Sequence, residues 1–234
     1  MSLSARIDGG PTWPRGVVFD LDGTLVDSAP DIASALNEVL ERRDLSPFPL
    51  DGVKRMIGGG VPALIRRALE AHGIEPHDIA PLVEDMIGVY SRRATALTVL
   101  YDGAEDELIR LQGAGVKLAI CTNKSQAITD IILRDMGLAK YFGSVIGAQE
   151  GRPHKPEPGA LQAVLDELGL EAGHAVMVGD SGADAGAAKA VGMKLVLVGF
   201  GYSTTPVEDF EPDAVIAHFG ELPDALHRIG GSRA

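Results

Sequence analysis

The chain has 234 residues, of which 45% are hydrophobic and 23% are charged, a composition that is typical of a folded globular protein and not of a disordered one. Its formal net charge of −12 argues against nucleic acid as a general partner, because no surplus of basic side chains is available to neutralise phosphates. The single cysteine, Cys121, excludes an intramolecular disulfide and favours a reducing compartment.

The chain carries no predicted membrane or export signal. No apolar run is long enough for a transmembrane helix. The N-terminal 16 residues lack the basic region and the apolar region of a secretory signal, and we expect residues 1–12 to form a leader. These features together predict a soluble, cytoplasmic protein.

The first apolar run, residues 16–22, ends in an acidic motif. It reads GVVFDLD and continues as GTLVDS, which places Asp20, Asp22 and Asp27 close together. Side chains two residues apart on a strand point to the same side, so Asp20 and Asp22 reach one pocket, and Gly23 permits a sharp turn there. Paired carboxylates need a cation or a shared proton, and Mg²⁺ prefers oxygen ligands. We therefore expect a magnesium site, in preference to a polar strand exit with helix-capping side chains.

Residues 29–98 predict helices and no convincing strand. Four helical patterns read DIASALNEVLERR, LDGVKRMIG, VPALIRRALEAHG and HDIAPLVEDMIGVYSRRATA. An insertion directly after the first strand lies over the edge where open α/β sheets bind ligands. We therefore interpret this segment as an all-helical cap over a site, the alternative being an ordinary helical insertion.

The remainder of the chain alternates between strand and helix patterns. Apolar runs rich in Val, Ile and Leu predict strands that are buried on both faces, over residues 116–123, 144–149, 175–181, 194–200 and 214–219. Helical patterns with start and stop signals separate most of them, over residues 103–115, 125–137, 158–169 and 184–192. This alternation predicts an open, doubly wound, mostly parallel α/β sheet. The catalytic core would comprise residues 13–28 and 99–234.

Two later segments contain residues that are suited to bind a phosphate group. Thr122 ends an apolar run, and its hydroxyl with the backbone N–H groups of Asn123 and Lys124 can hold a phosphate oxygen, the alternative being a plain helix N-cap. Lys155 lies between prolines in GRPHKPEP, where a fixed ammonium group can neutralise a carboxylate and a phosphate together. The alternative for this lysine is an exposed surface position.

A second acidic motif, VMVGDSGAD, also follows an apolar run. Asp180 lies at the predicted strand end and Asp184 one helical turn later, so both acidic motifs can converge on one metal ion. Ser181 lies in GDSG, a sequence also found around the nucleophile of trypsin-like proteases. We do not assign Ser181 as a nucleophile, because the disulfide-bearing all-β context of those proteases and the complete G-x-S-x-G motif are both missing.

In this order, DLDGTLVDS, ICTN, KPEP and GDSGAD resemble the motifs of the haloacid dehalogenase-like (HAD) hydrolase superfamily over nearly the whole chain. The resemblance implies a Rossmann-like HAD core with a helical cap, and a phosphatase that forms an aspartyl-phosphate on Asp20. Asp22 would be the general acid and then the general base, and Thr122 and Lys155 would bind the phosphoryl group. Asp22 points to phosphoryl chemistry, because superfamily members that dehalogenate lack Asp at this position.

The same resemblance implies a Mg²⁺ cofactor. The ion would be held by the Asp20 carboxylate, the Asp22 backbone carbonyl and Asp180, with Asp184 close by or acting through water. Alternatives to a phosphatase are a phosphosugar mutase of the same superfamily and a phosphate-binding regulator without catalysis. The Arg-Glu pair followed by Ser that such mutases carry in the cap is missing from RMIGGGVP.

Within the superfamily, the chain resembles the phosphoglycolate phosphatases, in KRMIGGGVPALIRRAL of the cap and in the C-terminal half. This implies a small phosphorylated metabolite as partner, 2-phosphoglycolate, with no nucleic acid or membrane partner, and a monomer or homodimer. Lys54 or Arg55 would pair with the substrate carboxylate, the alternative being solvated cap charges. The chain departs from the family pattern in the cap loop at Met56 and Gly59.

Overall fold

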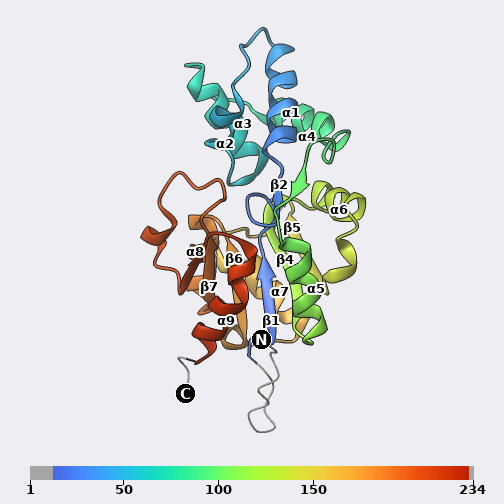
Figure 1. Ribbon diagram of the computed structural model, residues 1–234. Helices are drawn as coiled ribbons and strands as arrows, with labels where there is room; N and C mark the ends of the chain where they lie inside the picture. The colour runs from blue at the N-terminus through green and yellow to red at the C-terminus, as the bar shows by residue number, and fades with distance from the viewer. Residues whose placement is uncertain (1–12, 232–234) are drawn as a thin grey trace.

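The computed structural model describes residues 13–231, so the predicted leader lies outside the described residues. Figure 1 shows two parts, a group of helices at the top and a sheet flanked by helices below. Between residues 13 and 231, no helix has the length and apolar character that are needed to cross a membrane.

The lower part is built on one six-stranded sheet in which every neighbouring pair of strands is parallel. The strands in chain order are β1 (Gly16–Phe19), β4 (Lys117–Ser125), β5 (Ser144–Ala148), β6 (Ala175–Gly179), β7 (Lys194–Val198) and β8 (Ala214–Ile216). All six apolar runs form strands, which confirms the predicted doubly wound parallel sheet. The spatial order β5-β4-β1-β6-β7-β8 changes direction at β1, and open α/β sheets bind ligands at the carboxyl edge of such a point.

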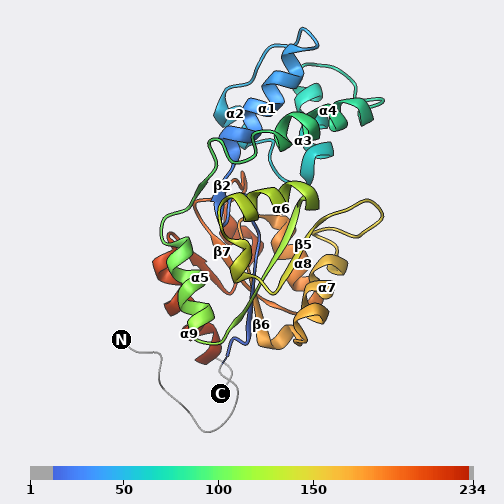
Figure 2. The ribbon, with the colours of Figure 1, turned by 90° about the vertical axis from the view of Figure 1, so that its right-hand side faces the viewer.

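Helices cover both faces of the sheet. One face, with Val17 and Phe19 of β1, packs against α5 (Ala104–Gly113), α6 (Gln126–Asp135) and α9 (Leu222–Gly231). The other face, with Val18, packs against α7 (Pro158–Leu168) and α8 (Gly182–Val191), and Figure 2 shows α5 and α9 on the opposite side from α7 and α8. Short 3₁₀ helices complete this part: η1 (Ala139–Tyr141), η2 (Ala172–His174), η3 (Val207–Phe210) and η4 (Phe219–Glu221).

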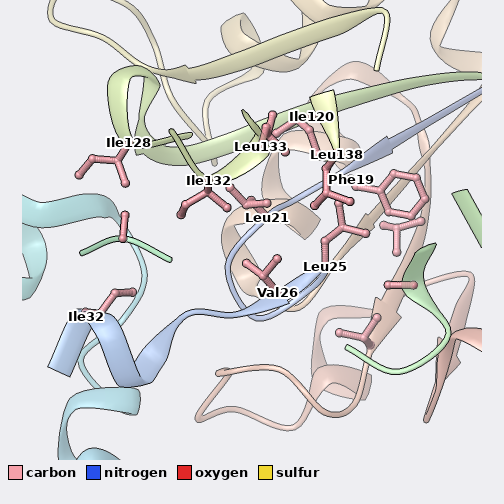
Figure 3. Close-up of a cluster of buried hydrophobic side chains, with 14 of the residues drawn as sticks. Phe19, Leu21, Leu25, Val26, Ile32, Ile120, Ile128, Ile132, Leu133 and Leu138 are labelled. Carbon is pink, nitrogen blue, oxygen red and sulfur yellow. The ribbon is translucent and has the colours of Figure 1, made fainter. Parts of the chain in front are cut away.

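The loop that carries the first acidic motif is anchored by apolar side chains. Leu21, Leu25 and Val26 are fully buried, and Figure 3 shows them beside Ile132 and Leu133 of α6. Asp20, Asp22 and Asp27, which adjoin these side chains in the sequence, are therefore held by a loop that the hydrophobic core fixes.

The upper part contains the four helices predicted for residues 29–98: α1 (Ala29–Glu41), α2 (Leu50–Lys54), α3 (Gly60–Ala71) and α4 (Ala80–Ser91). The two connections to the sheet form a short antiparallel ribbon of β2 (Val26–Asp27) and β3 (Val99–Leu100), which the sequence analysis did not predict. Asp31, in the first turn of α1, ties this helix to the second connection, since its Oδ2 accepts hydrogen bonds from the backbone N–H groups of Leu97 and Thr98 at 2.9 and 2.8 Å.

Candidate active site

A cavity of about 460 Å³ lies between the carboxyl ends of the strands and the helical cap. Its core wall includes Asp20, Asp22, Thr122, Asn123, Lys155 and Asp180. Its cap wall includes Arg55, Ile57, Leu64, Arg67, Met86 and Tyr90. The residues that the sequence analysis selected from the core therefore border one space, with the exception of Asp184.

Asp20 is the first residue after β1, and its carboxylate is held from two sides. Oδ1 accepts a hydrogen bond from the backbone N–H of Leu21 at 2.7 Å and lies 3.0 Å from Nζ of Lys155. Burial raises the pKa of the Asp20 carboxyl to about 6, against the opposing effect of Lys155. A fixed and partly desolvated carboxylate beside a cation is suited to act as a nucleophile.

The turn after Asp22 requires glycine. Gly23 has φ +78°, and a Cβ at this position would lie 2.4 Å from Oδ2 of Asp180. Only a residue without a side chain permits this approach of the two loops. Gly23 thereby allows the first acidic motif to lie directly against the second.

Both oxygens of Asp22 are engaged by other elements. Nζ of Lys124, in β4, donates to Oδ1 at 2.8 Å and to Oδ2 at 2.9 Å. The hydroxyl of Ser28, at the end of the first connection, donates to Oδ1 at 2.5 Å. Nζ of Lys124 also donates to the hydroxyl of Tyr90 in α4 at 2.7 Å. The Asp22 carboxylate is thus linked to the core, to the connection and, through Lys124, to the cap.

Lys155 is buried, with 2% of its surface exposed, so it is not the exposed lysine of the alternative interpretation. Its Nζ donates to Oδ1 of Asp184 at 2.7 Å and lies 3.0 Å from Oδ1 of Asp20. Burial acts to lower the pKa of Lys155, but Asp184 and Asp20 outweigh it and raise the pKa, so the ammonium group stays charged. Since an ammonium group has three donors, one N–H remains for a ligand.

Asp20, Asp180 and Asp184 form an acidic group in which one oxygen from each lies within 4.8 Å of the others. Burial and the neighbouring carboxylates raise the pKa of Asp180 well above its usual range. A divalent cation relieves this repulsion, and three carboxylates are a donor set that a hard cation prefers. The residues present therefore fit a divalent metal ion.

Asp184 has less freedom to bind a ligand than its two neighbours. Its Oδ1 accepts from Lys155, and its Oδ2 accepts from the backbone N–H and the hydroxyl of Ser181 at 3.0 and 2.7 Å. The bond from the Ser181 backbone N–H belongs to a capping box at the start of α8. Ser181 thus serves as the N-cap of α8, in line with our decision not to assign it as a nucleophile.

Thr122 and Asn123 lie at the end of β4 and border the cavity. The hydroxyl of Thr122 accepts a hydrogen bond from the backbone N–H of Lys124 at 3.2 Å. This N–H, which we expected to be available to a phosphate, is therefore already engaged by the preceding side chain. Nδ2 of Asn123 donates to the backbone oxygen of Lys155 at 2.7 Å, which ties the two phosphate-binding candidates together.

The two cap candidates differ in position. Nζ of Lys54 lies 3.4 Å from Oδ2 of Asp27, whereas Arg55 borders the cavity. Arg67, which the sequence analysis did not select, also borders the cavity and donates from Nη1 to the backbone oxygens of Met56 and Gly58 at 2.7 and 2.6 Å. Of the two residues proposed to meet a substrate, the structure places only Arg55 at the cavity.

Three further residues of the site, Lys124, Tyr90 and Tyr202, were not predicted from the sequence. Lys124 was considered only for its backbone, although it lies two residues after Thr122 on one strand, a spacing that places both side chains on one face. Tyr90 had no signal beyond the helical pattern of the cap. Tyr202 joins the second acidic motif to the first connection, because its backbone N–H donates to Asp180 at 2.7 Å and its hydroxyl donates to Asp27 at 2.7 Å.

Comparison with known sequences matches residues 17–198 to the family described as haloacid dehalogenase-like hydrolase. The chain belongs to this family. Two curated HAD relatives are named phosphoglycolate phosphatase. The protein from Cereibacter sphaeroides is 40% identical over 216 residues, covering 92% of this chain and 98% of the relative. The protein from Rhodospirillum rubrum is 39% identical over 228 residues, covering 94% and 95%.

Solved structures agree with this assignment. A crystal structure described as a predicted phosphoglycolate phosphatase from Haemophilus somnus superimposes with a TM-score of 0.86 at 28% identity, covering 92% of this chain and 99% of that one. The resemblance to HAD hydrolases and, among them, to phosphoglycolate phosphatases is confirmed. The predicted enzyme class, a phosphoric monoester hydrolase, is likewise supported by these relatives.

Proposed function

We propose that this HAD hydrolase is a Mg²⁺-dependent phosphatase that hydrolyses a small phosphomonoester, 2-phosphoglycolate, through an aspartyl-phosphate. The observation that carries the proposal is the position of Asp20, whose Oδ1 borders the cavity 3.0 Å from Nζ of Lys155 and lies within the group of three carboxylates. This arrangement supplies a nucleophile, a cation for the phosphoryl oxygens and a place for a metal ion. The names of the curated relatives support the choice of substrate.

In the first step, a carboxylate oxygen of Asp20 attacks phosphorus and the bond from phosphorus to the ester oxygen breaks. The carboxyl group of Asp22 gives its proton to that oxygen, so glycolate leaves as an alcohol. In the second step, the Asp22 carboxylate takes a proton from a water molecule that attacks the phosphorus of the aspartyl-phosphate. Inorganic phosphate leaves and the Asp20 carboxylate is restored.

The phosphoryl group would be held by three residues of the core wall. Lys155 has one N–H left for a phosphoryl oxygen, and the hydroxyl of Thr122 and the backbone of Asn123 border the same space. Fixed donors that are oriented before the reaction stabilise the charge that builds up on the phosphoryl oxygens in the transition state.

The acidic group would hold the metal ion. We assign the Asp20 and Asp180 carboxylates and the backbone carbonyl of Asp22 as ligands, and Asp184 as the residue that orients Lys155, because both of its oxygens already accept hydrogen bonds. When bound, the ion neutralises phosphoryl charge and offsets the repulsion among the carboxylates.

The cap would select the substrate. We propose that residues 29–98 form the cap domain and that residues 13–28 and 99–234 form the catalytic core. Arg55 borders the cavity from the cap side, opposite the phosphate-binding residues, so its guanidinium can pair with the carboxylate of 2-phosphoglycolate. Lys54 is paired with Asp27 and is the weaker candidate.

The test is phosphate release from 2-phosphoglycolate, p-nitrophenyl phosphate, several sugar phosphates and pyrophosphate. Release with Mg²⁺ that is abolished by chelator and falls at least about 10⁴-fold in Asp20→Asn supports the proposal. Asp166→Asn, which changes an exposed carboxylate in α7, is the matched control and should retain activity. Asp180→Asn should raise the Mg²⁺ concentration for half-maximal activity about 100-fold.

Two results would contradict the proposal. Release that survives both chelator and Asp20→Asn would exclude this site as the source of activity. If none of the esters is hydrolysed but sugar phosphates bind, a mutase or a regulator would replace the phosphatase.

A further inference from the structure

Nζ of Lys124 has as many hydrogen-bond acceptors around it as it has N–H donors. An ammonium group has three donors and no acceptor. The three acceptors around Nζ are both oxygens of Asp22, at 2.8 and 2.9 Å, and the hydroxyl of Tyr90, at 2.7 Å. The Lys124 side chain is 4% exposed. Every donor of this buried cation is therefore used within the protein.

This distinguishes Lys124 from Lys155, the other buried lysine of the cavity. Nζ of Lys155 contacts Asp184 and Asp20 and keeps one donor for a ligand, whereas Nζ of Lys124 keeps none. Lys124 is therefore poorly suited to bind phosphate. Its two bonds to one carboxylate instead fix the plane of Asp22, because the Ser28 hydroxyl bonds to Oδ1 alone and would by itself leave that group free to rotate.

The third partner of Lys124 comes from the cap. Tyr90 lies near the end of α4, is 2% exposed and also places its ring 4.6 Å from Nζ of Lys124. Movement of α4 away from the sheet would remove both contacts. Water would then solvate Lys124 and compete for its donors, which would weaken its hold on Asp22. The orientation of Asp22 thus depends on an element that is far from it in the sequence.

We propose that Lys124 and Tyr90 are positioning residues for Asp22: Tyr90 holds Lys124, and Lys124 holds the Asp22 carboxyl group in the orientation needed for proton transfer. The inference rests on the proposed role of Asp22 as general acid and base. The step that it serves moves one proton from the Asp22 carboxyl to the leaving ester oxygen, and needs no further reactant.

The test compares a poor leaving group with a good one. Protonation of the leaving oxygen matters for 2-phosphoglycolate, whose alcohol is weakly acidic, and matters little for p-nitrophenyl phosphate, which releases a stable anion. Tyr90→Phe should lower kcat/KM for 2-phosphoglycolate about tenfold, a part of the 10²–10⁴-fold that a general acid provides. Its kcat/KM for p-nitrophenyl phosphate should change less than about twofold. Lys124→Met should show the same difference between esters.

Two controls separate positioning from a structural role. Tyr141→Phe removes a tyrosine hydroxyl that bonds to Glu105, away from the cavity, and should affect neither ester. In an Asp22→Asn background, Tyr90→Phe should cause no further loss, because the two changes act on one proton transfer. Thermal melts of each variant establish that it is folded.

The outcomes distinguish this inference from the proposed function. Equal losses on both esters, no loss on either, or an undiminished loss in the Asp22→Asn background would overturn the positioning role. If Asp22→Asn lowers activity selectively on the poor leaving group but Tyr90→Phe does not, only the inference fails. If Asp22→Asn itself shows no selectivity, the proposed role of Asp22 fails and the inference fails with it.

Discussion

The two walls of the cavity are built differently. On the core wall, Asp20, Lys155 and Asp180 are buried and bound to one another or to fixed backbone groups. On the cap wall, Arg55 and Arg67 are exposed, and the adjoining loop contains three consecutive glycines with positive φ. A network of buried charges tolerates little change, whereas an exposed side chain without a fixed partner, such as Arg55 at the end of α2, can change with little disturbance of the fold. Tyr90 is the exception on the cap wall, because it is buried and bonded to Lys124 of the core. We therefore expect the chemistry to depend on the buried groups and the choice of substrate to depend on the exposed arginines.

Among variants that keep the nucleophile Asp20, the largest expected effect comes from removing the core-wall cation. Lys155→Met should lower kcat about 10²–10³-fold, because a preorganised donor to the phosphoryl oxygens is lost. The loss should be similar for 2-phosphoglycolate and p-nitrophenyl phosphate, since both carry the same phosphoryl group. Steady-state kinetics on both esters measures it, with Lys117→Met as control, because Lys117 contacts Leu168 at the other end of β4. A loss that is confined to one ester would show that Lys155 contributes to the choice of substrate and not only to binding the phosphoryl group.

A smaller and selective effect is expected on the cap wall. Arg55→Ala should raise KM for 2-phosphoglycolate about tenfold through the loss of a charged hydrogen bond, and should leave KM for p-nitrophenyl phosphate unchanged. Arg66→Ala, an exposed arginine of α3 outside the residues that border the cavity, is the matched control. If Arg55→Ala lowers kcat on both esters equally, Arg55 belongs to the chemistry and not to selection.

The smallest expected effect concerns the contact between the glycine loop of the cap and Asn123 of the core. Gly59 and Gly60 have nearly the same φ, +80° and +79°, but a Cβ at Gly60 would lie 2.9 Å from the backbone oxygen of Asn123 in the core, whereas a Cβ at Gly59 would meet only Ala63 of the cap, at 3.2 Å. Gly60→Ala should therefore displace the cap slightly and lower kcat/KM about fivefold relative to Gly59→Ala, which carries a comparable backbone strain. Kinetics of the two variants side by side decides this, and equal values would show that the cap loop does not bear on Asn123.

The predictions from sequence were accurate where the signal is local. Each of the six strands contains a run of apolar residues, and Asp20 and Asp180 each directly follow a strand. β2 and β3 were missed because two-residue strands are too short to show a period, and their pairing joins Val26 to Leu100.

The site was less predictable than the sheet, because its contacts join residues that are far apart in the sequence. The partner of Lys124 lies 102 residues away, so no local pattern indicates that this lysine contacts Asp22. Lys54 and Arg55 are neighbours at the end of α2 with similar charge, and only the tertiary contact with Asp27 shows which of them is already paired. The amphipathic helix α9 was not among the helices predicted from the sequence.

The ribbon of β2 and β3 has a consequence for how such enzymes diversify. Because Val26–Asp27 pairs with Val99–Leu100, the two ends of the inserted segment lie one strand spacing apart, about 5 Å. For the sheet, the whole insertion is equivalent to a hairpin loop. The segment can be shortened, lengthened or exchanged for an unrelated one without altering the distance that the core has to span. A new substrate preference could therefore be acquired by grafting at this ribbon, while the strands and the acidic motifs remain as they are.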